Sequence, residues 1–212
     1  MMEEKSNEEI RMDIGQIRET LGTHQTEQIQ ESSVMHAAVL IPLVQRDGAL
    51  HVLFEERNRS IPQGGEICFP GGQLEPGESP AEAAVRETAE ELLIAAEQIE
   101  LIAPMHRLSA NGARIIDSFL GRLQGYEGTW EPDEVARTFL IPLDSFLQTP
   151  PEVYEGRSRV IPGGDFPYDL IPGGRDYRFA STLQKFYFYR TEFGVIWGLT
   201  AKLLYHFTET LR

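Results

Sequence analysis

The sequence is short of cysteine, of positive charge and of long apolar runs. Cys68 is the single cysteine among 212 residues, so no intramolecular disulfide can form, and its apolar neighbours indicate a buried thiol without a chemical role in a reducing compartment. A formal net charge of −14 argues against a general nucleic-acid or anionic-membrane binder. No apolar run is long enough to span a bilayer, and the opening MMEEKSNEEIRMD is too acidic for a signal peptide. We therefore expect a cytoplasmic protein with no nucleic-acid or membrane partner.

The clearest element that is present is a helix within FPGGQLEPGESPAEAAVRETAEELLI, from Phe69 to Ile94. Ser79 is a preferred N-cap residue, Pro80 suits the first helical position, and Glu82 completes a capping box three residues after the serine. The pattern predicts a helix that begins at Pro80. At 100° per residue its apolar side comprises Ala81, Ala84, Val85, Thr88 and Leu92.

Three glutamates, Glu87, Glu90 and Glu91, project together from a neighbouring face of this helix. Like charges at this spacing repel each other, and Arg86, which faces Glu82 and Glu90, cannot face all three. An oxygen-liganded divalent cation is the natural compensation, because Mg²⁺ takes one or two carboxylates together with water and substrate phosphates. The alternative interpretation is a solvated acidic face.

The turn that precedes this helix favours the interpretation of the three glutamates as ligands of a divalent cation. Pro70, Gly71 and Gly72 allow a close backbone approach to a ligand near a helix N-terminus, where phosphate is favoured. The complete pattern resembles the signature of the Nudix hydrolase family, and its fixed positions are Gly72, Glu78, Arg86, Glu87, Glu90 and Glu91. Thr88 stands where the family usually has an aliphatic residue, and Leu93 where it usually has glycine.

The resemblance implies an α/β fold, a Nudix-type α/β/α sandwich with a mixed β-sheet, and a hydrolase that uses Mg²⁺ or Mn²⁺. Its metal ligands would be the three glutamates and a main-chain carbonyl near Gly71, and its substrate a small-molecule nucleotide. The ions would neutralise pyrophosphate oxygens and lower the pKa of an attacking water. Arg86 would orient the glutamates through Glu78, Glu82 or Glu90.

A narrower resemblance, to coenzyme A pyrophosphatases, involves two further segments. The run VLFEERNRSIPQGGEICFPGG is similar to the element before their signature, and Ile-Trp-Gly-x-Thr-Ala, from Ile196, is similar to their closing helix. Ile61 and Gln63 stand where that subfamily usually has arginine and histidine. The candidate substrate-binding residues are Arg57, Arg59, Phe69 and Gly72.

Around this centre, the sequence predicts a hairpin of residues 37–45 and 50–57, turning at Arg46-Asp47-Gly48, and a short strand at 66–69. Further strands are predicted at 99–108, 114–123, 135–143 and 185–190, with a turn at 109–112, a short helix near Asp144 and a final helix in VIWGLTAKLLYHFTETL. A carboxylate from the loop before residue 135 often joins the Nudix site. The candidates are Glu127, Glu131, Asp133 and Glu134.

We expect two parts: an N-terminal helix and tether at 1–33, whose apolar stripe runs from Ile10 to Leu21, and a Nudix domain at 34–212. Proline and glycine are dense at 149–178, which predicts a long insertion loop. This loop is either a plain surface insertion or a lid that offers Arg157, Arg159 and Arg175 to phosphate.

The leading hypothesis is a metal-dependent hydrolase of a nucleoside diphosphate linked to another group, preferably coenzyme A or acyl-CoA, that releases two monophosphates. One alternative is the same chemistry on ADP-ribose, a dinucleotide or a nucleoside triphosphate. Another is a Nudix domain that binds a ligand without catalysis. The sequence leaves the oligomeric state, the metal count and the general base open.

Overall fold

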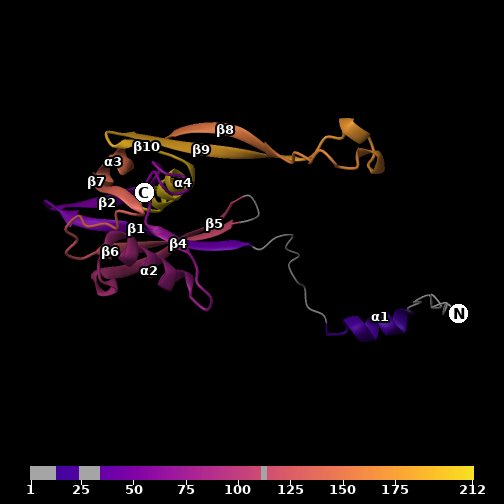
Figure 1. The fold of residues 1–212 in the computed structure, drawn as a ribbon, viewed down its shortest axis with the longest axis horizontal. Coiled ribbons are helices and arrows are strands. Elements are labelled where there is room, and N and C mark those ends of the chain that lie inside the picture. The colour runs from indigo at the N-terminus through magenta and orange to yellow at the C-terminus, as the bar shows by residue number, and fades with distance from the viewer. Residues whose placement is uncertain (1–12, 24–33, 111–113) are drawn as a thin grey trace. The chain divides into compact units, whose positions relative to one another are not determined.

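A computed structural model describes residues 13–23, 34–110 and 114–212 (Figure 1). Of the predicted features, Ile10 in the N-terminal stripe and Asn111 and Gly112 in the turn lie outside the described residues. By contacts, the chain divides into two units, Met1–Ser33 and Val34–Arg212.

The first unit contains helix α1, Ile14–Leu21. Asp13 caps it by accepting a 2.9 Å hydrogen bond from the Gln16 amide, and the Gln16 side chain returns a 2.9 Å bond to the Asp13 amide. This capping box starts the helix at Ile14.

The second unit is built on a seven-stranded sheet in the order β3-β2-β1-β6-β5, in which β4 also pairs with β1, and β7 with β2. β1 and β6 run parallel, whereas the other pairs are antiparallel, so the predicted mixed sheet is confirmed. The strands are β1 (Met35–Arg46), β2 (Ala49–Arg57), β3 (Ile67–Cys68), β4 (Gly71–Gln73), β5 (Ile99–Ala110), β6 (Arg114–Leu123) and β7 (Val135–Pro142).

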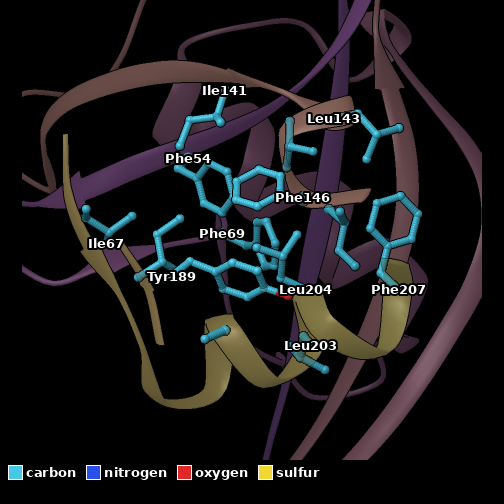
Figure 2. Close-up of a cluster of buried hydrophobic side chains, with 14 of the residues drawn as sticks. Phe54, Ile67, Phe69, Ile141, Leu143, Phe146, Tyr189, Leu203, Leu204 and Phe207 are labelled. Atoms are coloured by element: carbon cyan, nitrogen blue, oxygen red, sulfur yellow. The ribbon is translucent and has the colours of Figure 1, made fainter. Parts of the chain in front are cut away.

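The two faces of this sheet are covered by different helices. Because side chains alternate along a strand, Leu40 and Leu53 pack with Leu92 of helix α2, whereas Ile41 and Phe54 pack on the opposite face. The opposite face carries α3 and α4, whose buried side chains converge with Phe54 in Figure 2. The three layers confirm the α/β/α sandwich. The helices are α2 (Pro80–Leu92), α3 (Leu143–Gln148) and α4 (Gly198–Thr210), with a 3₁₀ turn at Ala96–Gln98.

The β1–β2 hairpin confirms the predicted turn. Asp47 and Gly48 have φ values of 51° and 79°, the left-handed pair that a two-residue hairpin loop requires. The tight turn fixes the register, in which Arg46 pairs with Ala49 and Leu43 with Val52.

The prediction that residues 149–178 form one irregular loop is wrong for its first part. β8 (Glu152–Arg159) pairs with β9 (Ser181–Thr191) in a long ribbon, with β10 (Gly194–Ile196) beside β9. The prolines and glycines lie mainly after β8, at the end of the ribbon, with 3₁₀ turns at Tyr168–Leu170 and Gly174–Asp176 (Figure 1). β8 gives no alternating signal because almost all of its side chains are exposed.

Within the described part of the chain, none of the helices has the length and apolar character that a bilayer crossing requires.

Candidate active site

The start of α2 is fixed as the sequence predicts. The Ser79 hydroxyl accepts a 3.3 Å bond from the Glu82 amide, and the Glu82 carboxylate accepts a 2.8 Å bond from the Ser79 amide. Glu82 therefore serves the cap. Of the three predicted partners of Arg86, the described contacts join it to Glu78 and Glu90 and not to Glu82. Thr88 is fully buried, and its hydroxyl donates to the Ala84 carbonyl at 2.6 Å, so a polar residue fits there without an unpaired donor.

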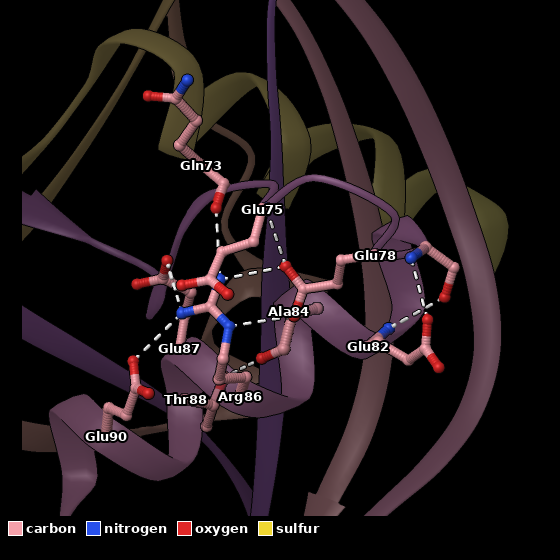
Figure 3. A network of polar contacts seen from close by, with 10 residues as sticks. Gln73, Glu75, Glu78, Glu82, Ala84, Arg86, Glu87, Thr88 and Glu90 are labelled. Carbon is pink, nitrogen blue, oxygen red and sulfur yellow. Dashed lines mark hydrogen bonds and ion pairs between the residues drawn. The ribbon is translucent and has the colours of Figure 1, made fainter.

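Arg86 lies at the centre of the acidic face of α2 (Figure 3). Its Nε and Nη2 donate to the two carboxylate oxygens of Glu78 at 2.9 and 3.0 Å, a bidentate pair. Its Nη1 lies 3.0 Å from Glu87 Oε1 and 3.1 Å from Glu90 Oε2. The bonds from Arg86 lower the pKa of Glu78. One guanidinium therefore connects three carboxylates, and Glu78 holds it in place.

Glu91 faces the sheet. The residue is 4% exposed, and its Oε2 accepts a 2.8 Å hydrogen bond from the Gly71 amide. Burial raises the pKa of Glu91, and the negative charge of Glu55 raises it further. Of the three glutamates predicted to project from one face of the helix, Glu91 lies at its buried edge, beside Leu92.

The three carboxylates thus form a gradient from solvent to interior. The Glu90 side chain is 62% exposed and that of Glu87 is 18% exposed. Burial also raises the pKa of Glu87, although Arg86 opposes the shift. The acidic side chains of α2 therefore extend from the solvent, at Glu90, to the buried amide of Gly71, which Glu91 contacts.

The predicted glycine turn includes the start of strand β4, since Gly71 and Gly72 pair with Val39 and Ala38 of β1. This segment needs its glycines for a steric reason. A Cβ at Gly72 would overlap the Glu87 carboxylate, and a Cβ at Gly71, whose φ is 146°, would overlap the β1 backbone at Ala38 and Val39. Gly72 therefore gives Glu87 its position, and the Gly71 amide holds Glu91. The predicted use of a carbonyl near Gly71 as a metal ligand stays a prediction.

The side chains at this site are carboxylates, the type of ligand that suits a divalent cation with oxygen ligands. Among residues 13–23, 34–110 and 114–212, no three acidic, histidine or cysteine side chains already form a cage for an ion. Arg86 Nη1 engages both Glu87 and Glu90. However, Glu55 Oε2 is buried without any hydrogen-bond partner. Carboxylate oxygens and an unpartnered buried acceptor are the ligand chemistry that Mg²⁺ and Mn²⁺ prefer.

Sequence reasoning missed Glu55. This residue of β2 is fully buried, and its Oε1 accepts a 3.2 Å bond from Cys68 Sγ on the neighbouring strand. Burial raises the pKa of Glu55 and also that of the Cys68 thiol, so the cysteine stays protonated. The available signal was an acid that directly follows the apolar run Val52-Leu53-Phe54.

The predicted substrate residues divide into two groups. Arg57, Phe69 and Gly71 line a cavity of about 270 Å³ together with Gln63 and Trp197. In contrast, Arg59 and Gly72 are not among its lining residues.

Two of these residues have structural contacts as well. The Arg57 Nε donates to the Pro62 carbonyl at 3.3 Å. Phe69 is 3% exposed and stacks on Phe54 at 5.1 Å between ring centroids. Phe69 is therefore mainly a core residue that closes the floor of this cavity.

The loop that carries the predicted extra carboxylate is tied to the end of α2. The Glu131 amide donates to the Glu91 carbonyl at 2.8 Å, and the Thr129 hydroxyl donates to the Leu92 carbonyl at 2.6 Å. Of the four candidate acids, Glu134 is the one whose charge raises the pKa values of Glu55 and Glu87. The charges of Glu127, Glu131 and Asp133 are not among the main causes of these two shifts.

Arg157, Arg159 and Arg175 line a different cavity, of about 640 Å³, at the end of the β8–β9 ribbon. Arg175 lies over the ring of Tyr168, at 5.1 Å from its centroid. The prediction that these arginines donate hydrogen bonds to a substrate phosphate stays a prediction.

The fold and the site together define a class of protein: three-layer α/β domains in which a glycine turn and a glutamate-rich helix form one acidic site. The profile of the NUDIX domain matches residues 34–163, more than half of the chain. The chain belongs to the Nudix family.

Several known proteins are similar to this chain. Peroxisomal coenzyme A diphosphatase NUDT7 of Mus musculus is 32% identical over 132 residues, 61% of this chain and 55% of that protein. Nudix hydrolase 3 of Caenorhabditis elegans is 37% identical over 120 residues, 52% of this chain and 49% of that protein. The chain thus spans about half the length of these two relatives. The solved structure of the Nudix hydrolase RenU from M. smegmatis is 23% identical, with a TM-score of 0.47, over 55% of this chain and 76% of that one.

Proposed function

We propose that this chain hydrolyses the pyrophosphate bond of coenzyme A or acyl-CoA with the help of Mg²⁺ or Mn²⁺. One observation carries the choice of substrate: two segments that resemble coenzyme A pyrophosphatases line the same cavity. Arg57, Gln63 and Gly71 come from the first segment, and Trp197 and Thr200 from the second. The similarity to NUDT7 of Mus musculus, a coenzyme A diphosphatase by name, supports this choice.

The catalytic residues in this proposal are those of the acidic helix. Glu87, Glu90 and Glu91 hold the cation, which when bound supplies positive charge to the pyrophosphate oxygens and acidifies water. Arg86 positions Glu87 and Glu90, since both accept from its Nη1. The Gly71 amide positions Glu91. The proposed nucleotide site is the cavity that Gly71 helps to line, and the amide of the same glycine holds Glu91.

The proposed general base is Glu134. It is exposed to solvent, so it can take a proton from water and pass it on. Its backbone is fixed, because the Asn58 amide donates to its carbonyl at 2.8 Å. The assignment is supported by the loop that carries Glu134, which is bonded to α2 through the Glu131 amide and the Glu91 carbonyl at 2.8 Å, and by the charge of Glu134, which raises the pKa of Glu87.

A substrate panel tests the proposal. Purified protein is incubated with Mg²⁺ and coenzyme A, acetyl-CoA, ADP-ribose, a diadenosine polyphosphate or ATP, and the products are separated by chromatography. We expect adenosine bisphosphate and phosphopantetheine from coenzyme A, and no release from Glu90→Gln. Turnover of ADP-ribose without turnover of coenzyme A would remove the proposed substrate. A panel with no cleavage at all, with ligand binding retained, would instead favour a binding module.

A further inference from the structure

Glu55 lies on the face of the sheet that carries the acidic helix. Along β2, Leu53 packs with Leu92 of α2, whereas Phe54 packs in the cluster on the opposite face. Alternation places the Glu55 side chain on the same face as Leu53. Its charge is the largest charge effect on the pKa of Glu91, ahead of that of Glu87. Glu55 therefore lies on the face of the acidic site, two residues along β2 from Leu53, which packs with Leu92 next to Glu91.

The contacts of Glu55 leave one oxygen unused. Its Oε1 accepts from the Cys68 thiol at 3.2 Å, whereas its Oε2 has no hydrogen-bond partner and the residue is fully buried. A thiol is a weak donor, and a buried carboxylate oxygen without a partner is costly. Such an acceptor indicates a partner that is not a protein group, either an ordered water or an ion.

The arginines near Glu55 are already engaged. The Nε of Arg57 donates to the Pro62 carbonyl at 3.3 Å. Arg86 pairs with Glu78, Glu87 and Glu90. In the part of the chain that the structure describes, no ion pair joins a cation to Glu55 or Glu91. The two buried carboxylates thus lack an ion-pair partner, although the charge of Arg57 acts on both and lowers their pKa values.

We propose that Glu55 is a positioning residue of the acidic site, a fourth carboxylate that acts through Glu91 to raise the affinity of the site for divalent cations. This inference rests on the proposed function. Once ionised, a carboxylate in a low-dielectric interior attracts a cation more strongly than a solvated carboxylate does, and the number of ligand charges tunes cation affinity. Because Glu55 is held in the sheet, it adds this charge without the entropy cost of ordering a surface side chain.

The test compares the Mn²⁺ affinity of wild type, Glu55→Gln and Glu56→Gln by electron paramagnetic resonance of free Mn²⁺. Glu55→Gln keeps the shape and removes the charge, and we expect its affinity to be about 10- to 100-fold weaker. Glu56→Gln removes the same charge one residue along β2, where the carboxylate pairs with Arg137 at 2.7 Å. Its affinity should equal that of wild type.

The outcomes separate this inference from the proposed function. If wild type binds Mn²⁺ and Glu55→Gln binds it equally well, Glu55 is a neutral structural acid and only this inference is overturned. If wild type binds no Mn²⁺, the proposed function is overturned as well.

A second measurement does not depend on the folding of a variant. In a crystal structure of the wild-type protein with Mn²⁺, Glu55 Oε2 should contact the ion or an ordered water. A protein donor at that oxygen, or no partner there, would overturn the inference.

Discussion

The amide of Gly71 donates a 2.8 Å hydrogen bond to Oε2 of Glu91, twenty residues further along the chain. This bond joins the glycine turn to the acidic helix, so the two halves of the sequence signature form one unit. It also gives a buried carboxylate a backbone donor, which favours its ionised form. Changes on either side of the bond should therefore affect both stability and cation binding.

Gly72→Ala should lower both the stability of the protein and its affinity for cations, because the added Cβ overlaps the Glu87 carboxylate. Overpacking of this kind costs about 1–3 kcal/mol, and a displaced Glu87 should lower Mn²⁺ affinity. Urea unfolding and Mn²⁺ titration measure the two effects. Gly164→Ala is the matched control, since nothing lies within 4 Å of the position of its Cβ. Equal Mn²⁺ affinity of Gly72→Ala and wild type would contradict the assigned role of Gly72.

Arg86→Lys should lower kcat/KM by about 10- to 100-fold, the usual effect of losing a residue that orients metal ligands. A lysine keeps the charge but cannot bond both oxygens of Glu78 while it also reaches Glu87 and Glu90. The control is Arg107→Lys, because Arg107 makes a similar bidentate pair with Asp117, at 2.8 and 3.0 Å, on β5 and β6. A loss of the same size in both variants would show a general effect on folding.

The metal-free protein should lose stability as pH rises above the ordinary glutamate value of 4.5, because burial raises the pKa values of Glu55, Glu87 and Glu91. The folded state binds these protons more tightly than the unfolded chain, so their contribution is present at low pH and is lost as pH passes the raised values. Since a cation needs ionised ligands, stabilisation by Mn²⁺ should increase over the same range.

Thermal unfolding with and without Mn²⁺, at several pH values from about 5 to 10, measures both trends. The unfolding temperature of the metal-free Glu91→Gln variant should depend less on pH than that of the metal-free wild type. A stabilisation by Mn²⁺ that does not change with pH would contradict the prediction.

Leu93→Gly should stabilise the protein by about 1 kcal/mol, because non-glycine residues in the left-handed region carry a cost of about that size. Leu93 ends α2 with φ 52° and ψ 47°, and it is 53% exposed, so little burial is lost. Chemical denaturation measures the gain. Leu93→Ala, which keeps the strained backbone, should not show it, and equal stability of the two variants would contradict the strain.

Glu134→Gln should lower kcat by about 100-fold, the lower limit for the loss of a general base. Mn²⁺ affinity should change little, because Glu134 is not one of the proposed ligands and, unlike Glu55, it is exposed to solvent, which screens its charge. Glu127→Gln, in the same loop, is the control. A fall in Mn²⁺ affinity with an unchanged kcat would move Glu134 from proton transfer to cation binding.

Much of the fold could be predicted because it follows from local pattern. Ser79 and Pro80 mark the helix start, Asp47-Gly48 marks the hairpin turn, and alternating or apolar runs mark the main strands. β8 could not be predicted, because a strand whose side chains are exposed on both faces leaves no period in its residues. Its existence depends on pairing with β9, which lies beyond the proline-rich segment.

By itself, the sequence determined the family signature, the glutamate-rich helix and the glycine turn, because these depend on residue types at short spacings. Only the tertiary structure decided that Glu91 faces inward, that Arg86 joins Glu78 to Glu87, and that Glu55 approaches from the sheet. The physical reason is distance along the chain. Helical periodicity gives directions within one helix, but which of them points to solvent is set by the sheet that packs against it.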